Sequence, residues 1–221
     1  MTTASPIDHN KLIAAAAKEA LSPLGLKRDG KSRLWYDDHG WWCIVVEFQP
    51  SSWSKGTYLN VGVSWLLFEK AHWTFDVGHR EQGFSPARAE QQFTDALSRI
   101  VAHASERVRA YRESFATIQS AHRHYQSIEL RSHWDYYHAA LIAALAGELS
   151  TTRKHFEWLL AQPRPHPWQH GLYFRALDLN RLLDSRREFL DSVRGIVHRT
   201  RTQLLLDDVE TREIGLPDDV T

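Results

Sequence analysis

The sequence predicts an α+β protein in which a small antiparallel β-sheet packs against helices and an α-helical hairpin region follows. Two observations carry this prediction. The segment Trp41–Phe68 holds two alternating apolar and polar runs joined by a Pro/Ser/Lys-Gly connection, which is typical of a wide antiparallel hairpin. The segments before and after it place apolar residues at spacings of three and four, which is typical of amphipathic helices.

The predicted sheet has one apolar face. Because side chains alternate along a strand, the core-facing residues of the two runs are Trp42, Ile44, Val46 and Phe48, then Leu59, Val61, Val63, Trp65 and Leu67. A shorter run, Arg33–Asp37, predicts a strand before them, and the alternation in Ala71–Val77 predicts one after them. A sheet with one apolar face needs a cover, which the flanking helices can supply.

Two Ser-Pro pairs mark predicted helix starts. Ser5-Pro6 provides a cap and a proline in the first helical position, and we expect a helix from there to about Leu21. Ser85-Pro86 repeats the signal. The apolar spacing from Phe93 to Ile118 then predicts one long amphipathic helix or two nearly collinear helices.

The second half of the chain predicts helical hairpins. Trp134–Ala146 and Ser150–Gln162 form one predicted pair, which is similar to a single tetratricopeptide-type hairpin, and Ala176–Leu190 holds another. Between the two pairs, Gln162–Gly171 is rich in proline, so we expect a loop there rather than a helix.

The composition is that of an ordinary globular protein, with 27 basic and 27 acidic residues in 221. A lone cysteine, Cys43, excludes an intramolecular disulfide and favours a cytoplasmic location, and no segment predicts a membrane span. We expect an α+β domain over residues 1–125, a helical hairpin region over 126–205 and an acidic tail over 206–221.

Short motifs in the first half of the chain resemble a bacterial family, the domain of unknown function 4304 family. They lie in LSPLGLKRDGKSRLWYDD and VVEFQPSSWSKGTYLNVGV, and the matching positions are Gly25, Trp35, Phe48, Gln49, Ser51, Asn60, Val61 and Gly62. The resemblance implies an α+β domain and a bacterial, cytoplasmic setting. It implies no catalytic residues, because no activity is established for that family.

The sheet face opposite the predicted core is the best candidate binding surface. Gly62 inside a strand suggests that something approaches the backbone closely, and Asn60 and Ser64 beside it could hydrogen-bond a peptide or a small ligand. The candidate residues on this face are Glu47, Gln49, Tyr58, Asn60, Gly62 and His72. The simpler interpretation is a solvated face that carries polar side chains where they belong.

The connection between the two long strands carries an indole, Trp53, in a polar loop that ends at Gly56. Trp53 is either an anchor for a protein partner or a cap folded back on the edge of the core. Trp168, in the proline-rich loop, has the same two interpretations.

The chain has thirteen histidines, but none of their pairs has the companion ligands of a metal motif. The tightest pairs are His122 with His124, His133 with His138, and His166 with His170. We therefore expect no metal and no cofactor. We also expect Cys43 to be a small buried residue rather than a nucleophile.

The leading functional hypothesis is a non-enzymatic protein-binding role, of an immunity or regulatory type, through the polar sheet face or the tryptophan loops. The alternative is an enzyme of unknown class that uses Glu47, Asn60 and His72, since carboxylates and imidazoles are the usual proton carriers. A third possibility, nucleic-acid association through the basic helices, is not favoured because the excess positive charge is spread thinly.

Overall fold

The computed structural model describes residues 8–207 and 215–217, so the predicted helix start at Ser5-Pro6 and most of the acidic tail lie outside the described residues. The chain divides into two compact units, which are treated separately below. The first unit holds the described residues up to Asp38, then Cys43–Ser64 and Val77–Arg112, and the second holds His39–Trp42, Trp65–Asp76 and the described residues from Glu113 onward. Each unit therefore draws on segments that are far apart in the sequence.

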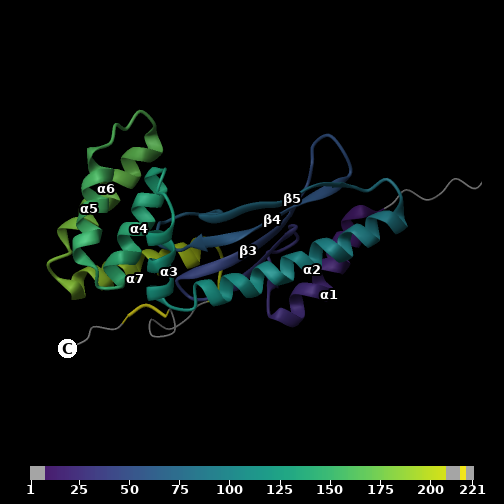
Figure 1. Cartoon of the computed structure of the whole chain (residues 1–221), viewed down its shortest axis with the longest axis horizontal. Coiled ribbons are helices and arrows are strands. Elements are labelled where there is room, and N and C mark those ends of the chain that lie inside the picture. Colours follow the sequence, from purple (N-terminus) through teal and green to yellow (C-terminus); the bar gives the residue numbers. More distant parts are fainter. Residues whose placement is uncertain (1–7, 208–214, 218–221) are drawn as a thin grey trace, which may run out of the picture. The chain divides into compact units, whose positions relative to one another are not determined.

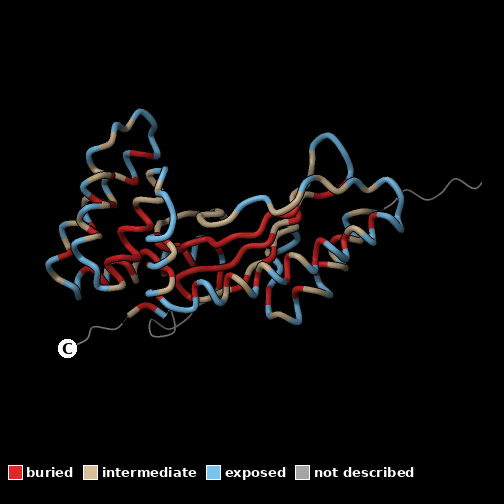
Figure 2. Tube along the Cα trace, in the orientation of Figure 1, coloured by how far each residue is buried: buried red, intermediate tan, exposed pale blue. Residues whose placement is uncertain are grey.

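The first unit is built on a five-stranded antiparallel sheet with the strands in sequence order (Figure 1). The strands are β1 (Lys27–Arg28), β2 (Leu34–Asp38), β3 (Trp42–Gln49), β4 (Gly56–Trp65) and β5 (Val77–Pro86). Figure 2 shows the burial concentrated in β3 and β4, where Ile44, Val46 and Phe48 and then Leu59, Val61 and Val63 are all inaccessible to solvent. The predicted α+β class and the core face of the two long strands are confirmed.

The last strand differs from the prediction. Of the predicted strand Ala71–Val77, only Val77 belongs to β5, and Ala71–Asp76 forms no strand, because Asp76 and Thr74 use their side chains in hydrogen bonds. The strand is Val77–Pro86, whose intermediate burial and glycines hide the alternation on which sequence prediction depends. Pro86 ends this edge strand instead of starting a helix, a place where a missing N–H costs little.

Two helices lie along the sheet within the first unit (Figure 1). They are α1 (His9–Leu21), capped by Asp8 and followed by the 3₁₀ turn η1 (Ser22–Leu24), and α2 (Glu90–Ser114). Ion pairs tie α2 to the sheet: Arg112 lies 2.7 Å from Asp37 of β2, and Arg107 lies 2.9 Å from Glu81 of β5.

The second unit holds the remaining helices, which Figure 1 labels α3 to α7. They are α3 (Ile118–Ser127), α4 (His133–Leu145), α5 (Leu149–Ala161), α6 (Pro167–Arg181) and α7 (Arg186–Gln203). Helix α4 contacts α3, α5 and α6, as expected of a central helix. The predicted loop was wrong from Pro167 onward, because proline in the first helical position is compatible with a helix start and His166 serves as the cap.

An aromatic cluster forms the core of the second unit beside these helices. Trp65 stacks on Trp41 with ring centroids 5.0 Å apart and packs edge to face against Phe115 at 5.2 Å. The buried Trp65 indole donates a hydrogen bond to the Tyr125 hydroxyl at 2.9 Å. These contacts fix the position of Trp65, whose backbone N–H donates a hydrogen bond to Asp76 of the candidate site.

Candidate functional site

Five side chains on the polar sheet face of the first unit contact one another. The Asn60 amide donates to Glu47 at 2.8 Å and to Gln49 at 3.1 Å, and Gln49 also accepts a hydrogen bond from Arg80 at 2.5 Å. Arg80 in turn lies over the Tyr58 ring, 4.0 Å from its centroid. These groups use much of their hydrogen-bonding capacity on one another.

The approach predicted at Gly62 is made by the protein itself. Gly62 pairs with Gly78 of the neighbouring strand β5, and Gly78 has a φ of +89°. A Cβ at Gly78 would lie 2.8 Å from the Gly62 Cα and 2.6 Å from the Val61 carbonyl oxygen. Close contact with the neighbouring backbone thus accounts for Gly78 without a ligand.

The set Glu47, Asn60 and His72 does not form one cluster within a unit. Glu47 and Asn60 lie in the first unit, whereas His72 belongs to the second. The predicted polar face is not solvated throughout, because Trp41 is only 3% exposed and Cys43 is fully buried. Cys43 is thus the small buried residue that the sequence predicts.

The Trp53 indole extends into solvent. Its side chain is 94% exposed, so it does not fold back as a cap on the core, and its backbone N–H is held by the Ser51 hydroxyl at 3.2 Å. Trp168 is 46% exposed but lies at the first turn of α6 and stacks on another indole. The two tryptophans, equivalent in the sequence prediction, therefore have different surroundings.

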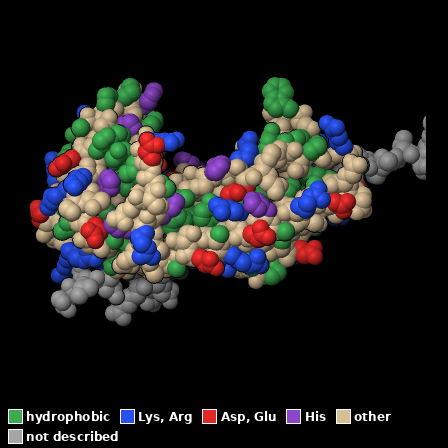
Figure 3. Space-filling model, viewed as in Figure 1, with side chains coloured by type: hydrophobic (Ala, Val, Ile, Leu, Met, Phe, Trp, Pro, Cys, Tyr) green, Lys and Arg blue, Asp and Glu red, His purple; other side chains and the backbone are tan. Residues whose placement is uncertain are grey.

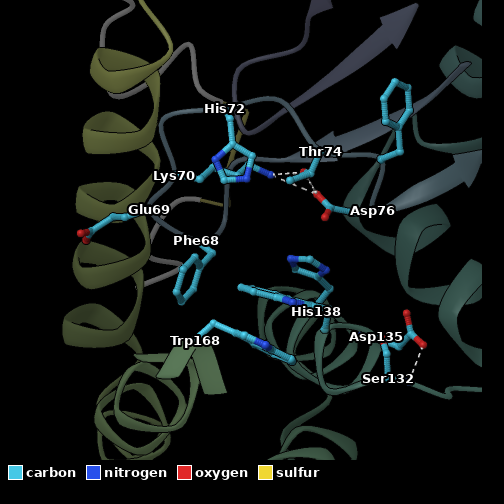
Figure 4. Close-up of a pocket in the computed structure, with 12 residues that line it drawn as sticks. Phe68, Glu69, Lys70, His72, Thr74, Asp76, Ser132, Asp135, His138 and Trp168 are labelled. Atoms are coloured by element: carbon cyan, nitrogen blue, oxygen red, sulfur yellow. Dashed lines mark hydrogen bonds and ion pairs between the residues drawn. The ribbon is translucent and has the colours of Figure 1, made fainter. Parts of the chain in front are cut away.

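A cavity of about 500 Å³ lies entirely within the second unit (Figure 4). Its ring-bearing lining residues are Phe68, His72, Phe75, Trp134, His138 and Trp168. Its other lining residues are Glu69, Lys70, Thr74, Asp76, Ser132 and Asp135. Figure 4 shows Lys70, Thr74 and Asp76 on one side of the open space, with His138 and Trp168 on the other.

A buried ion pair forms the polar side of the cavity. The Lys70 ammonium lies 3.1 Å from Asp76 Oδ2 and 2.6 Å from the Thr74 hydroxyl oxygen, and both charged side chains are about nine-tenths buried. Thr74 donates to the same carboxylate oxygen at 2.9 Å, and the Trp65 backbone N–H donates to it at 2.8 Å. One oxygen of Asp76 thus receives three hydrogen bonds from this loop and from the end of β4.

The second oxygen of Asp76, Oδ1, accepts no hydrogen bond from any residue that the structure describes. Burial acts to raise the pKa of Asp76, but the Lys70 ammonium, the Trp65 N–H and the Thr74 hydroxyl outweigh it and hold the pKa below its ordinary value. The carboxylate is therefore ionised at neutral pH. It presents an acceptor with unused capacity at the cavity wall.

His138 faces this carboxylate across the cavity in Figure 4. It belongs to α4, whose sequence from Tyr137 to Leu145 is buried on every side, so the imidazole is only 2% exposed. Burial lowers the pKa of His138 to about 4, against the attraction of Asp76 and with the help of the nearby Lys70 charge. The ring is neutral at pH 7 and offers one donor and one acceptor.

Aromatic rings make up the apolar side of the cavity. Trp134 stacks between His138, at 5.8 Å between ring centroids, and Trp168, at 5.9 Å. Phe68 packs edge to face on Trp134 at 4.8 Å. Such a stack presents flat apolar surface beside two polar groups, which is the usual composition of a small-molecule site.

The arrangement of the described residues does not support a metal site. Among the described residues, no group of three or more His, Cys, Asp or Glu side chains is arranged to hold a metal ion. Surface charge is similarly unconcentrated on the face seen in Figure 3, where acidic and basic side chains are interspersed. That face therefore shows no basic patch of the kind that nucleic-acid binding requires.

The sequence predicts His72 as a candidate residue but does not predict the cavity that it lines. The Lys70–Asp76 pair is local, and its partner His138 is 62 residues away from Asp76 in the chain, so spacing gives no hint of their proximity. One signal was present. His138 lies between two tyrosines and the apolar run Ala139–Leu145, which predicts an imidazole on a fully buried helix. A polar group in such a place needs a hydrogen-bond partner or a function.

No family model, curated protein or solved structure matches the chain, so the resemblance to the domain of unknown function 4304 family stays a prediction. Within the described ranges, every helix is too short or too polar to cross a membrane. The assignment of function therefore depends on the geometry of the site alone.

Proposed function

We propose that the protein is a non-enzymatic binding protein whose second unit takes a small flat ligand into the aromatic cavity. One observation carries the proposal: Asp76 Oδ1 and the His138 ring have no hydrogen-bond partner among the described residues, and both face a cavity of about 500 Å³ walled by indoles. Both groups open on the cavity, so a ligand that enters it can use their hydrogen-bonding capacity, and a few polar groups among apolar walls are the usual composition of a small-molecule site.

The ion pair supports binding rather than fold stability alone. A buried ion pair seldom stabilises a fold more than apolar residues of the same volume would. Here it fixes the carboxylate, because Lys70, Thr74 and the Trp65 N–H all hold one oxygen and leave the other directed elsewhere. Fixing a binding group in this way lowers the entropy that is lost when a ligand binds.

A thermal-shift screen with small aromatic compounds tests this proposal. We expect some compounds to raise the melting temperature of the wild type and of Trp53→Ala, and to raise that of Trp168→Ala much less, since Trp168 lines the cavity and Trp53 does not. Both variants remove an indole, so they are matched. The absence of any stabilising compound, or equal shifts in the two variants, would contradict the proposal.

A protein partner of the immunity or regulatory type is a second candidate, and Trp53 supports it. An indole that is 94% exposed on a loop has the properties of an interface anchor. Tagged wild type should then retain a stoichiometric partner that Trp53→Ala loses and that Ser54→Ala, a change in the same exposed loop, keeps. Retention of the partner by Trp53→Ala would refute this role for the loop.

A further inference from the structure

We propose that the ligand of the aromatic cavity is a neutral, planar heterocycle that carries an amino group, of the nucleobase or nucleoside type. This inference rests on the function proposed above and adds the chemical class of the ligand. It follows from three properties of the cavity: the charge balance of its walls, the hydrogen-bonding groups that are open to it, and the shape of its apolar side.

The charge balance favours a ligand without net charge. Lys70 compensates Asp76 at 3.1 Å, and Glu69 is paired with Arg175 at 2.8 Å and with Arg199 at 2.7 Å. The charged side chains in and next to the wall are therefore three of each sign: Lys70, Arg175 and Arg199 against Glu69, Asp76 and Asp135. Asp135 forms no ion pair with the described residues, but it closes the capping box of α4 and accepts hydrogen bonds from the backbone N–H groups of Arg131 and Ser132 at 2.9 and 2.8 Å. Each acid of the wall is thus already engaged by a cation or by N–H groups at a helix N-terminus, which leaves a charged ligand little to repay its desolvation.

The open polar groups favour an amino group next to a ring nitrogen. Asp76 Oδ1 can only accept, so the ligand must bring an N–H or O–H donor to it. A neutral His138 can accept or donate, depending on its tautomer, and so it complements a ring nitrogen or a ring N–H. An aminopyrimidine or aminopurine edge offers both kinds of group on one flat ring.

The apolar side favours a flat ring. Trp134, Trp168 and Phe68 supply aromatic surface, and the partly exposed Trp168 leaves a ring edge or face accessible at the mouth of the cavity. Stacking on aromatic side chains is how proteins bind unpaired bases. A volume of about 500 Å³ also leaves room for a sugar beside the base.

Isothermal titration calorimetry with adenosine and with purine riboside, which lacks only the amino group, tests the inference on the full chain. We expect adenosine to bind saturably and purine riboside to bind about tenfold to a hundredfold more weakly, because Asp76 Oδ1 then loses its donor. Choline serves as the cationic probe and should not bind. Trp168→Ala should weaken the binding of adenosine, and Trp53→Ala, the matched control outside the cavity, should leave it unchanged.

The alternative outcomes separate the ligand class from the proposed function. Equal affinity for the two nucleosides, or binding of choline alone, would overturn the amino-heterocycle class while leaving a cavity that binds small molecules. If neither nucleoside binds but indole does, and Trp168→Ala abolishes the binding of indole, the class is again wrong and the cavity keeps its role. If none of the probes binds to the wild type, both the ligand class and the proposed binding function are contradicted.

Discussion

The polar sheet face of the first unit and the cavity of the second unit each combine a carboxylate, a basic side chain and aromatic rings, but they differ in how far their polar groups are satisfied. On the sheet face, Asn60 bonds both Glu47 and Gln49, and Arg80 bonds Gln49. In the cavity, Asp76 keeps one oxygen and His138 keeps its ring without a hydrogen bond from the described residues.

Residue type alone therefore does not identify a site. Glu, Asn, Gln and Arg side chains that bond one another have little left to offer a ligand, and they act mainly as a solvated network that holds strands together. A carboxylate whose one oxygen is pinned by three donors, facing a neutral imidazole and stacked indoles, has capacity that only another molecule can use.

Removal of the cavity carboxylate should have the largest effect on stability. Asp76→Ala leaves the buried Lys70 ammonium without its carboxylate and the Trp65 N–H without its acceptor, which should lower the free energy of unfolding by about 3–5 kcal/mol. Urea unfolding measures the loss. Glu47→Gln on the sheet face keeps an oxygen that can accept from Asn60, and we expect a change below about 0.5 kcal/mol for it. Equal losses of unfolding free energy in the two variants would contradict the difference between the cavity and the sheet face.

Acid should destabilise the protein through His138. Its pKa is about 4 when folded and near 6.5 when unfolded, so the unfolded state binds more protons between these values and stability falls as the pH drops from about 6.5 to 4. His138 accounts for a loss of about 3 kcal/mol in this window.

The variant His138→Gln should flatten the stability profile between pH 6.5 and 4, as followed by urea unfolding at each pH. His72→Gln is the matched control, because this imidazole also lines the cavity but is exposed to solvent. The assignment to His138 would be wrong if both variants kept the pH dependence of the wild-type unfolding free energy.

Disruption of the sheet-face network should have a moderate effect. Asn60→Ala removes the amide that bridges Glu47 and Gln49, and we expect a loss of about 1 kcal/mol in unfolding free energy. Binding of any ligand that the cavity takes should not change in this variant. A loss of ligand binding in Asn60→Ala, with the fold intact, would transfer the functional role to the sheet face.

Truncation of the exposed indole should have the smallest effect. Trp53→Ala removes a side chain that is 94% exposed, so unfolding free energy should change by less than about 0.5 kcal/mol in chemical denaturation. A large destabilisation would mean that the loop packs on the protein after all, which would remove the argument for an interface anchor.

The sequence was a good guide to the sheet and a poor guide to the cavity, for physical reasons. Strong alternation predicted the ends of β3 and β4 within three residues, because Ile44 and Val61 must face one core. Strand β5 lacks that alternation, and the loop before it imitates a strand because aromatic residues alternate with Thr74 and Asp76. Their side chains bond within the loop, and periodicity cannot predict this.

A crystallographic fragment screen of the full chain compares the cavity and the sheet face as binding sites in one experiment. We expect ring-bearing fragments to collect in the cavity, stacked against Trp168 and with a donor within hydrogen-bond distance of Asp76 Oδ1. Fragments that bind at the Glu47, Asn60 and Gln49 face while the cavity stays empty would contradict it.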